Sequence, residues 1–253
     1  YQSIKLEQNE IVVAGGQESM SRATHSIFLK DDKKFIEDNL IDTMIKDGLM
    51  DSFNDYHMGV TAENIAEKYY ITRQEQDIFS ISSQKKAKKA YEEKKFNDEL
   101  IKLQIQSNNE KFIFEHDEYL RNNITLDDLE KLNTVFKENG TVTPGNSSGL
   151  NDGAAALVLM TREKAELKSL EILASIVSWS SSGVEPSLMG LGPIPSIKEA
   201  LIKAQWQIED IDLFEINEAF AAQTLAVIRE LKIPEEKVNV NGGAIALGHP
   251  IGA

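Results

Sequence analysis

The stretch Val238–Ala253, VNVNGGAIALGHPIGA, decides the prediction of the fold. A short β-prone run ends in Asn241-Gly242-Gly243, and a small apolar segment, Ala244–Leu247, follows it. Gly248-His249-Pro250 then holds one imidazole on a loop, where the proline favours extended backbone geometry at the histidine and the glycine permits a close approach. The pattern suits a fixed catalytic base at the end of a strand, although an isolated Gly-His-Pro is more often a turn with a surface histidine.

Length, composition and charge limit the kinds of protein that fit. The chain has 253 residues, 41% of them hydrophobic, which fits one large or two ordinary soluble globular domains. No apolar run approaches the roughly 20 residues that span a bilayer, and no signal peptide is visible, so we expect a cytoplasmic protein without membrane contact. The net charge of −14 argues against nucleic acid as a partner, but it permits a small anionic ligand.

Cysteine and histidine usage argues against a metal site. The chain has no cysteine, so it can build neither a disulfide framework nor a thiolate metal site. Its four histidines lack metal-ligand spacing, so we expect no metal. His25 and His116 fit no motif and are interpreted as surface residues. The sequence starts at Tyr1 and stops within a glycine-rich loop, so it is expected to be an internal piece, or the ordered portion, of a longer protein.

Strand and helix patterns alternate in the second part of the chain. We expect strands there at 154–160, 171–179, 211–216 and 238–241, and helices at 163–167 and from Ser196, which has capping-box spacing, to about Trp206. A further buried strand is expected near the start of the chain, at 10–14. Such alternation indicates βαβ units and a largely parallel sheet covered on both sides. Ligands of such sheets bind at the carboxyl ends of strands. Asn217 and His249 both follow strands, so we expect them to meet in one site.

The segment between residues 21 and 140 is polar and charged. Thr61 is a candidate cap for a helix over 62–69, Thr72 and Glu75 form a capping box that opens a longer helix, and Thr125 caps another. Short strands are expected at 101–105 and 111–114.

Three strings together resemble the thiolase family: IVVAGGQESM at 11–20, NEAFAAQ at 217–223 and the histidine loop. Residues 56–64, YHMGVTAEN, resemble the biosynthetic subgroup more than the degradative one. The resemblance covers essentially the whole chain. It implies an α/β thiolase fold, layered α-β-α-β-α from two βαβ-type halves with an inserted loop domain. Residues 1–20 and 150–171 would end the N-terminal half, 21–149 would form the inserted loop domain that binds coenzyme A, and 172–253 most of the C-terminal half.

The resemblance implies Claisen condensation of two acetyl-CoA to acetoacetyl-CoA and CoA, or the reverse thiolysis, through an acyl-cysteine. Coenzyme A thioesters would be substrates, and no cofactor would be permanently bound. His249 would match the histidine that activates the nucleophile, and Asn217 the asparagine that positions a water in the oxyanion hole. Both cysteines of the family mechanism, one before Tyr1 and one after Ala253 by the family pattern, are absent, so the chain as given could not complete the reaction.

The resemblance also implies a coenzyme A site and an assembly. His57 and Met58 would line the pantetheine and acyl end, Arg121 would meet the nucleotide and Ser148 a pantetheine amide. An apolar wall would come from Leu49, Phe136, Ala219 and Phe220. Residues 26–43 align with the hairpin through which thiolase dimers form tetramers, so a homodimer or homotetramer is expected. The alternatives are a degradative 3-ketoacyl-CoA thiolase and a non-catalytic coenzyme A-binding or scaffold protein.

Overall fold

The computed structural model describes residues 1–27, 40–107 and 110–253. The centre of residues 26–43, the expected tetramer hairpin, lies outside the described residues. The α-helices are α1 (Gln2–Lys5), α2 (Met58–Lys68), α3 (Arg73–Glu92), α4 (Leu126–Glu130), α5 (Arg162–Leu167), α6 (Pro193–Ala204), α7 (Ala221–Leu231) and α8 (Ala244–Leu247). The strands are β1 (Ile11–Ser19), β2 (His25–Ser26), β3 (Ile41–Asp42), β4 (Met50–Asp51), β5 (Tyr56–His57), β6 (Leu103–Ser107), β7 (Glu110–Phe114) and β8 (Asp152–Met160). Shorter helical turns are η1 (Met20–Arg22), η3 (Met44–Leu49), η4 (Pro186–Leu191), η5 (Ile208–Asp210) and η6 (Glu235–Lys237).

Side-chain caps fix the starts of two helices where the sequence predicted them. The Thr72 hydroxyl accepts from the Glu75 backbone N–H at 3.2 Å, and the Glu75 carboxylate accepts from the Thr72 N–H at 2.7 Å. Thr125 and Asp128 make the same reciprocal pair at the start of α4. Each pair satisfies backbone donors that have no partner within the helix, which is why α3 and α4 begin there.

Two other predicted helix starts are wrong. The cap of α2 is His57, whose Nδ1 accepts from the Gly59 N–H at 3.0 Å, whereas the Thr61 hydroxyl lies inside the helix and donates to the Met58 carbonyl. The α6 helix begins at Pro193 rather than after Ser196. Proline suits the first helical turn because its fixed φ is already helical and its missing N–H would have had no partner there.

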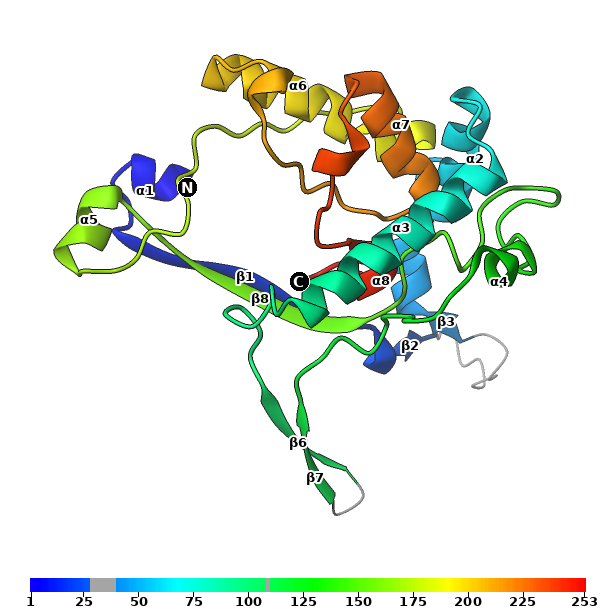
Figure 1. Ribbon diagram of the computed structural model, residues 1–253, viewed down its shortest axis with the longest axis horizontal. Helices are drawn as coiled ribbons and strands as arrows, with labels where there is room; N and C mark the ends of the chain where they lie inside the picture. The colour runs from blue at the N-terminus through cyan, green and yellow to red at the C-terminus, as the bar shows by residue number, and fades with distance from the viewer. Residues whose placement is uncertain (28–39, 108–109) are drawn as a thin grey trace, which may run out of the picture.

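The longest paired strands match the predicted ones and extend beyond them. β1 pairs antiparallel with β8 over nine residues, from Ile11 opposite Met160 to Ser19 opposite Asp152. β6 pairs with β7 as a hairpin. Figure 1 shows the β1–β8 ribbon running along one side of the molecule, with α1 and α5 at its far end and the β6–β7 hairpin projecting away from the helices.

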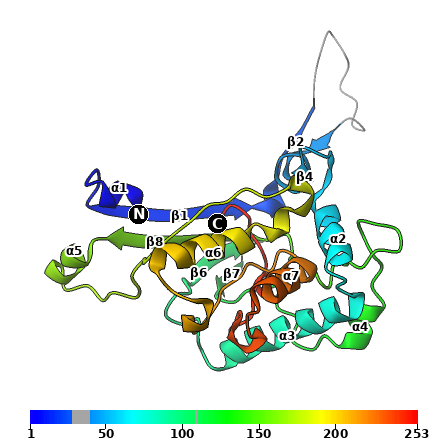
Figure 2. The same ribbon diagram turned by 90° about the horizontal axis from the view of Figure 1, so that it is seen from above.

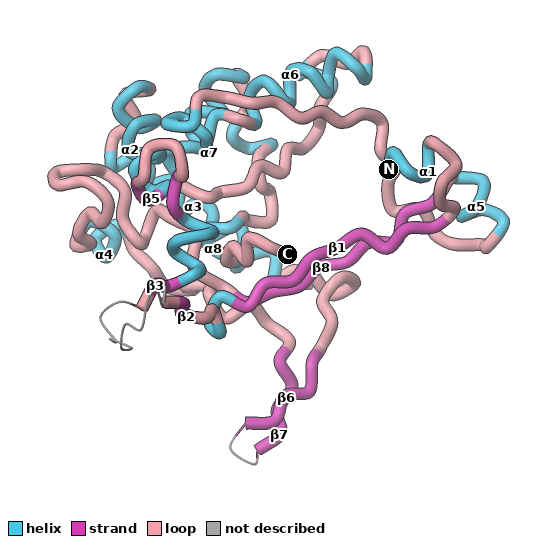
Figure 3. Tube along the Cα trace, turned by 180° about the vertical axis from the view of Figure 1, so that it is seen from behind, coloured by secondary structure: helices cyan, strands magenta, loops and turns pink. Residues whose placement is uncertain are grey.

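The predicted parallel sheet is not formed within the described residues, where the four sheets are each antiparallel and two-stranded. Residues 171–179 contain no strand and run as a loop between α5 and η4 (Figure 3). A strand needs a neighbour that completes its backbone hydrogen bonds. No such backbone partner occurs in the described chain for 171–179, and Leu173 is 86% exposed.

The other two predicted strands meet at one parallel bridge, Phe214 with Val238. Beyond the bridge the Asn239 side chain takes over the pairing. Its Oδ1 accepts from the Ile216 N–H and its Nδ2 donates to the Ile216 carbonyl, both at 2.8 Å. A side chain therefore replaces the backbone ladder directly before Asn217.

The hydrophobic core lies among α2, α3, α6 and α7, which gather on one side of the β1–β8 ribbon (Figure 2). α7 is its centre, because nine of its eleven residues are buried. Ala221, Ala222 and Ala226 are fully buried, and their small side chains let α2 and α3 approach closely. Among the described residues no helix is long and apolar enough to cross a bilayer.

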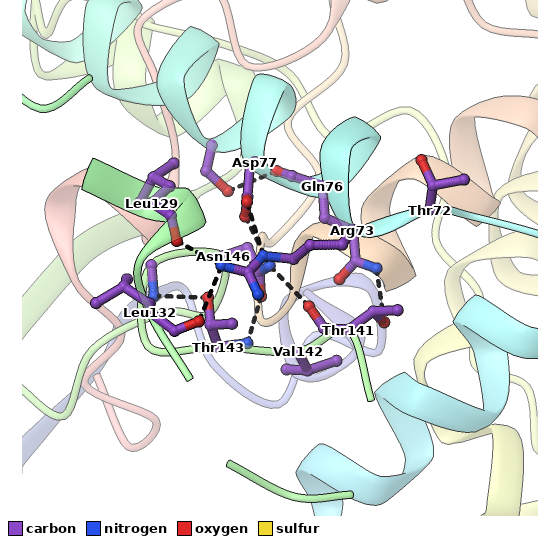
Figure 4. Close-up of polar contacts among 12 residues, drawn as sticks. Thr72, Arg73, Gln76, Asp77, Leu129, Leu132, Thr141, Val142, Thr143 and Asn146 are labelled. Carbon is purple, nitrogen blue, oxygen red and sulfur yellow. Dashed lines mark hydrogen bonds and ion pairs between the residues drawn. The ribbon is translucent and has the colours of Figure 1, made fainter. Parts of the chain in front are cut away.

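A buried polar network joins α3 to the loop over 141–146 (Figure 4). The fully buried Asp77 accepts from Arg73 Nε at 2.7 Å and from Asn146 Nδ2 at 2.9 Å. Asn146 Oδ1 in turn accepts from the Thr143 N–H at 2.8 Å, and Arg73 Nη2 donates to the Leu132 carbonyl at 3.2 Å. The carboxylate thus holds an irregular loop whose own backbone groups lack a regular ladder.

Replacing Asp77 with alanine is expected to lower the free energy of unfolding by about 3 kcal/mol. The value is at the low end for a broken buried ion pair because Arg73 keeps some solvent contact. The control Glu93→Ala removes a carboxylate from an exposed ion pair with Lys89 at the end of the same helix and should cost about 0.5 kcal/mol. Urea unfolding of the chain measures both, and equal losses would contradict the assignment.

Candidate active site

The Asn217 amide and the His249 imidazole are in contact. Asn217 Nδ2 lies 3.2 Å from His249 Nε2, although the residues are 32 positions apart. Asn217 lies in the turn that leads into α7, and His249 follows α8. The expectation that these two side chains meet in one site is confirmed. Their chemical roles stay predictions.

The loop that carries His249 is seated on the turn before β8. The Asn151 Oδ1 accepts from the His249 N–H at 3.2 Å. Gly248 has φ +102°, and a side chain there would overlap the Asn151 amide. A side chain at Gly153 would overlap the Pro250 ring. The residues on both sides of His249 are therefore held by close packing against the turn before β8.

The His249 ring is neutral and has one acceptor nitrogen. Burial lowers its pKa below the ordinary value for histidine, so the ring is neutral near pH 7. With the donor Nδ2 of Asn217 facing Nε2, that nitrogen acts as the acceptor. A neutral imidazole with an acceptor nitrogen at the site suits a general base.

A row of aromatic rings lies beside the Asn217 turn. The His57 ring stacks on Phe136 at 4.6 Å, and Phe136 meets Phe220 edge to face at 6.2 Å. Gly59 leaves room for the Phe136 ring, which any larger residue there would overlap. Met58, Phe136 and Ala219 pack against the small buried cluster that contains Phe220. Four predicted wall and substrate residues, Met58, Phe136, Ala219 and Phe220, are thus brought together, with His57 against Phe136.

His57 acts as a helix cap and as part of this wall. Its Nδ1 accepts from the Gly59 N–H, so the proton of the neutral ring lies on Nε2. Burial lowers the pKa of His57, which favours this neutral form. The Nε2–H is left as the ring's donor for a ligand.

Ser148 lies on a segment that pairs with the Asn217 turn. Its backbone N–H and its hydroxyl donate to the Ala219 carbonyl at 3.0 and 3.1 Å. Two residues after Ala219, the Ala221 N–H donates to the Asn146 carbonyl at 2.9 Å. Because the Ser148 hydroxyl proton is used here, its oxygen lone pairs remain to accept from a ligand N–H.

A cavity of about 160 Å³ opens beside Asn217. Its walls are mostly apolar and come from α2, η4, the Asn217 turn and the first turns of α6 and α7. Thr61, Ala62, Ile65, Met189, Gly190, Pro193, Asn217, Ala219, Phe220 and Gln223 line it. Sequence reasoning placed Ala219 and Phe220 in the wall but missed Met189, which lies in no motif, and Gln223, which ends the NEAFAAQ string but was given no role.

Arg121 and Leu49 lie apart from this cavity lining. The Arg121 N–H donates to Gln84 Oε1 at 2.9 Å, and its exposed guanidinium lies over the Tyr119 ring at 5.2 Å. Leu49 is buried at the end of η3, and the next residue, Met50, pairs with His57. Neither position tests its predicted contact with a ligand.

Sequence reasoning also missed the polar residues that support the site, of which Glu218, Ser83 and Asn239 are the most buried. The string NEAFAAQ contains Glu218, but its partners are distant in sequence, so no local spacing indicates them. Among the described residues, no group of three or more acidic, histidine or cysteine side chains could hold a metal ion.

Family models match almost the whole chain. The N-terminal domain of thiolase matches residues 1–163, and the C-terminal domain of thiolase matches 170–253. The acetyl-CoA acetyltransferase of Paracoccus denitrificans is 51% identical over 252 residues, which are all of this chain and 64% of that protein. A probable acetyl-CoA acyltransferase of Staphylococcus epidermidis is also 51% identical, over all of this chain and 65% of that protein. The chain therefore spans slightly less than two thirds of these curated relatives.

Solved structures show the same fold. The crystal structure of the Bacillus anthracis acetyl-CoA acetyltransferase matches 98% of this chain and 63% of its own, with a TM-score of 0.93 and 45% identity. Human mitochondrial 3-ketoacyl-CoA thiolase in complex with CoA matches all of this chain and 63% of its own, with a TM-score of 0.92 and 40% identity. The predicted thiolase fold is confirmed, whereas the predicted division into 1–20 with 150–171, 21–149 and 172–253 stays a prediction.

The half-buried imidazole of His249 is expected to titrate below about 6.5, the ordinary value for histidine. Its pKa is lower in the folded than in the unfolded chain, so the unfolded chain takes up the proton first. This residue's contribution to stability is therefore present above about pH 6.5 and is lost as the pH falls from there through the folded pKa. Histidine NMR signals followed against pH, with His249→Asn to assign them, measure the pKa, and a value above 6.5 would contradict the burial argument.

Proposed function

Because this chain belongs to the thiolase family, we propose that the whole protein is an acetyl-CoA C-acetyltransferase. It joins two acetyl-CoA into acetoacetyl-CoA and CoA, or runs the reverse thiolysis. The observation that carries the proposal is the 3.2 Å contact between Asn217 and His249 beside a small apolar cavity. The proposed reaction needs a base and an amide donor near the same thioester carbonyl. His249 and Asn217 lie close enough together to serve as these two groups.

In the proposed mechanism His249 activates a thiol and helps hold the thioester oxygen. A free thiol has a pKa near 8.5, so only a few per cent is thiolate near pH 7. The neutral imidazole takes the thiol proton as the sulfur attacks the acyl carbon. The bond between that carbon and the CoA sulfur then breaks, and the imidazolium gives its proton to the departing CoA thiolate. The chain has no cysteine, so the nucleophile and the second thiol belong to segments outside these 253 residues.

Asn217 would help to stabilise the negative charge that develops on the thioester oxygen. When the α-carbon of the second acetyl-CoA loses its proton, charge builds on the thioester oxygen. A fixed amide that holds a water at that oxygen stabilises the charge, and one such donor is worth about 3 kcal/mol. The amide lies in the turn that leads into α7, next to the imidazole.

The pantetheine arm would lie along the aromatic row. Met58, Phe136 and Phe220 supply the apolar wall, while the His57 Nε2–H and the Ser148 oxygen supply a donor and an acceptor. Arg121, exposed and cationic, would meet the nucleotide phosphates. One similar solved structure is a complex with CoA, which supports coenzyme A thioesters as substrates. That no cofactor is permanently bound stays an expectation from the sequence.

The size of the cavity favours a short acyl group. Its volume of about 160 Å³ is below the roughly 300–1,000 Å³ of sites that bury drug-sized ligands. A degradative 3-ketoacyl-CoA thiolase, the main alternative, would have to place a long chain elsewhere. A homodimer or homotetramer and a cytoplasmic location remain proposals from the sequence.

A full-length form is expected to thiolyse acetoacetyl-CoA with a kcat/KM at least tenfold above that for a 3-ketoacyl-CoA of twelve or more carbons, because the cavity accepts a short group. Steady-state kinetics on both substrates measure the ratio. A preference for the long chain would identify the degradative alternative, and turnover of neither would favour a binding protein.

Removing the two contacting groups should abolish most of the turnover. His249→Ala is expected to lower kcat by about 10²- to 10⁴-fold through loss of the base, and Asn217→Ala by about 10²-fold through loss of the oxyanion donor. His25→Ala, an exposed histidine on β2, is the matched control and should keep wild-type kcat. Wild-type turnover in His249→Ala would refute the assigned base.

A further inference from the structure

We propose that Glu218 is a positioning residue whose buried carboxylate sets the separation between the Asn217 amide and the His249 imidazole. The inference rests on the proposed function for its consequence in catalysis, but its geometry stands alone. Glu218 is 1% exposed and directly follows Asn217 in the turn that leads into α7. A carboxylate so far from water is costly unless donors surround it.

Three donors surround the carboxylate, and each comes from a different segment. Ser83 Oγ on α3 donates at 2.6 Å, Asn239 Nδ2 at 2.8 Å and the Ile245 N–H of α8 at 3.2 Å. An ionised carboxylate only accepts, so it matches three donors. Burial raises the pKa of Glu218, and these donors act in the opposite sense.

One arm of this arrangement fixes the Asn217 side of the site. Asn239 Nδ2 donates both to Glu218 and to the Ile216 carbonyl, and Asn239 Oδ1 accepts from the Ile216 N–H. Ile216 directly precedes Asn217. The residues on both sides of Asn217 are thus tied to one asparagine side chain.

The other arm fixes the His249 side. The Ile245 N–H is bound to the carboxylate directly, and the Gly243 N–H donates at 3.1 Å to Ser83 Oγ, which itself donates to Glu218. Any side chain at Gly243 would overlap the carboxylate. The backbone at Gly243 therefore packs directly on Glu218. From Gly243 the chain reaches His249 through the short helix α8 and Gly248.

The isosteric variant Glu218→Gln tests the inference. It keeps the shape but turns one acceptor into a donor that faces another donor. Since a misplacement of about 1 Å can cost about 10²-fold in rate, we expect kcat of a full-length form to fall by about 10- to 100-fold, with KM changed less than about threefold. Glu215→Gln, the same exchange three residues earlier at an exposed position, should stay within twofold of wild type.

A second readout does not depend on turnover. The NMR signals of the His249 ring and the Asn217 amide should shift in Glu218→Gln and stay unchanged in Glu215→Gln. Wild-type kcat in Glu218→Gln, or a loss of kcat with both signals unchanged, would overturn the positioning role. A wild-type protein without turnover would defeat the proposed function, and the NMR comparison would still decide this inference.

A milder variant decides the matter if Glu218→Gln does not fold. Ser83→Ala removes one donor to the carboxylate and the acceptor of the Gly243 N–H. It should lower kcat about three- to tenfold and shift the His249 signals more than those of Asn217, because it loosens only one arm. Unchanged kcat and signals in folded Ser83→Ala would overturn the inference.

Discussion

Buried carboxylates hold the irregular backbone around the site in place. Such backbone has no ladder of its own, yet its buried N–H groups need acceptors. Glu63, on α2, accepts from the Thr141 and Val142 N–H groups at 2.8 Å. Asp77, on α3, holds Asn146, and Glu218 holds the loop that leads to His249. Each of these residues is at most 3% exposed, so the chain places buried carboxyl groups where loops, rather than helices or sheets, must be held in place.

This arrangement determines how the two candidate catalytic groups are presented. Asn217 and His249 lie at the ends of short, irregular segments, which by themselves would move. Their contact is kept by supports on three sides: Asn151 under the histidine, Asn239 before the asparagine and Glu218 between them. Preorganised donors cost no reorganisation when charge develops. The rigidity of these loops is therefore part of the proposed chemistry and not only of stability.

The sequence predicts local features well and long-range ones poorly. Thr72 with Glu75 was recognisable because a capping box is complete within four residues. Thr61 was misleading, since the actual cap of α2, His57, is not a residue type that usually caps helices. Asn217 and His249 were found through whole strings. Glu218 was passed over within the same string because Ser83, its closest partner, is 135 positions away. A strand at 171–179 was predicted from its own residues, but a strand exists only with a neighbour.

The absence of cysteine from the chain separates the proposed chemistry into two parts. Bond-making at sulfur needs thiols that these residues do not contain, whereas proton uptake and stabilisation of negative charge need an imidazole and an amide, which they do. The second part depends more on geometry, because a donor acts only at the right distance from the developing charge. The imidazole and the amide are 32 positions apart, and their carboxylate support also bonds to Ser83 on α3, 135 positions away. Any thiol that completes the site must therefore be placed within reach of the His249 imidazole and the Asn217 amide, whose positions are already set by the fold.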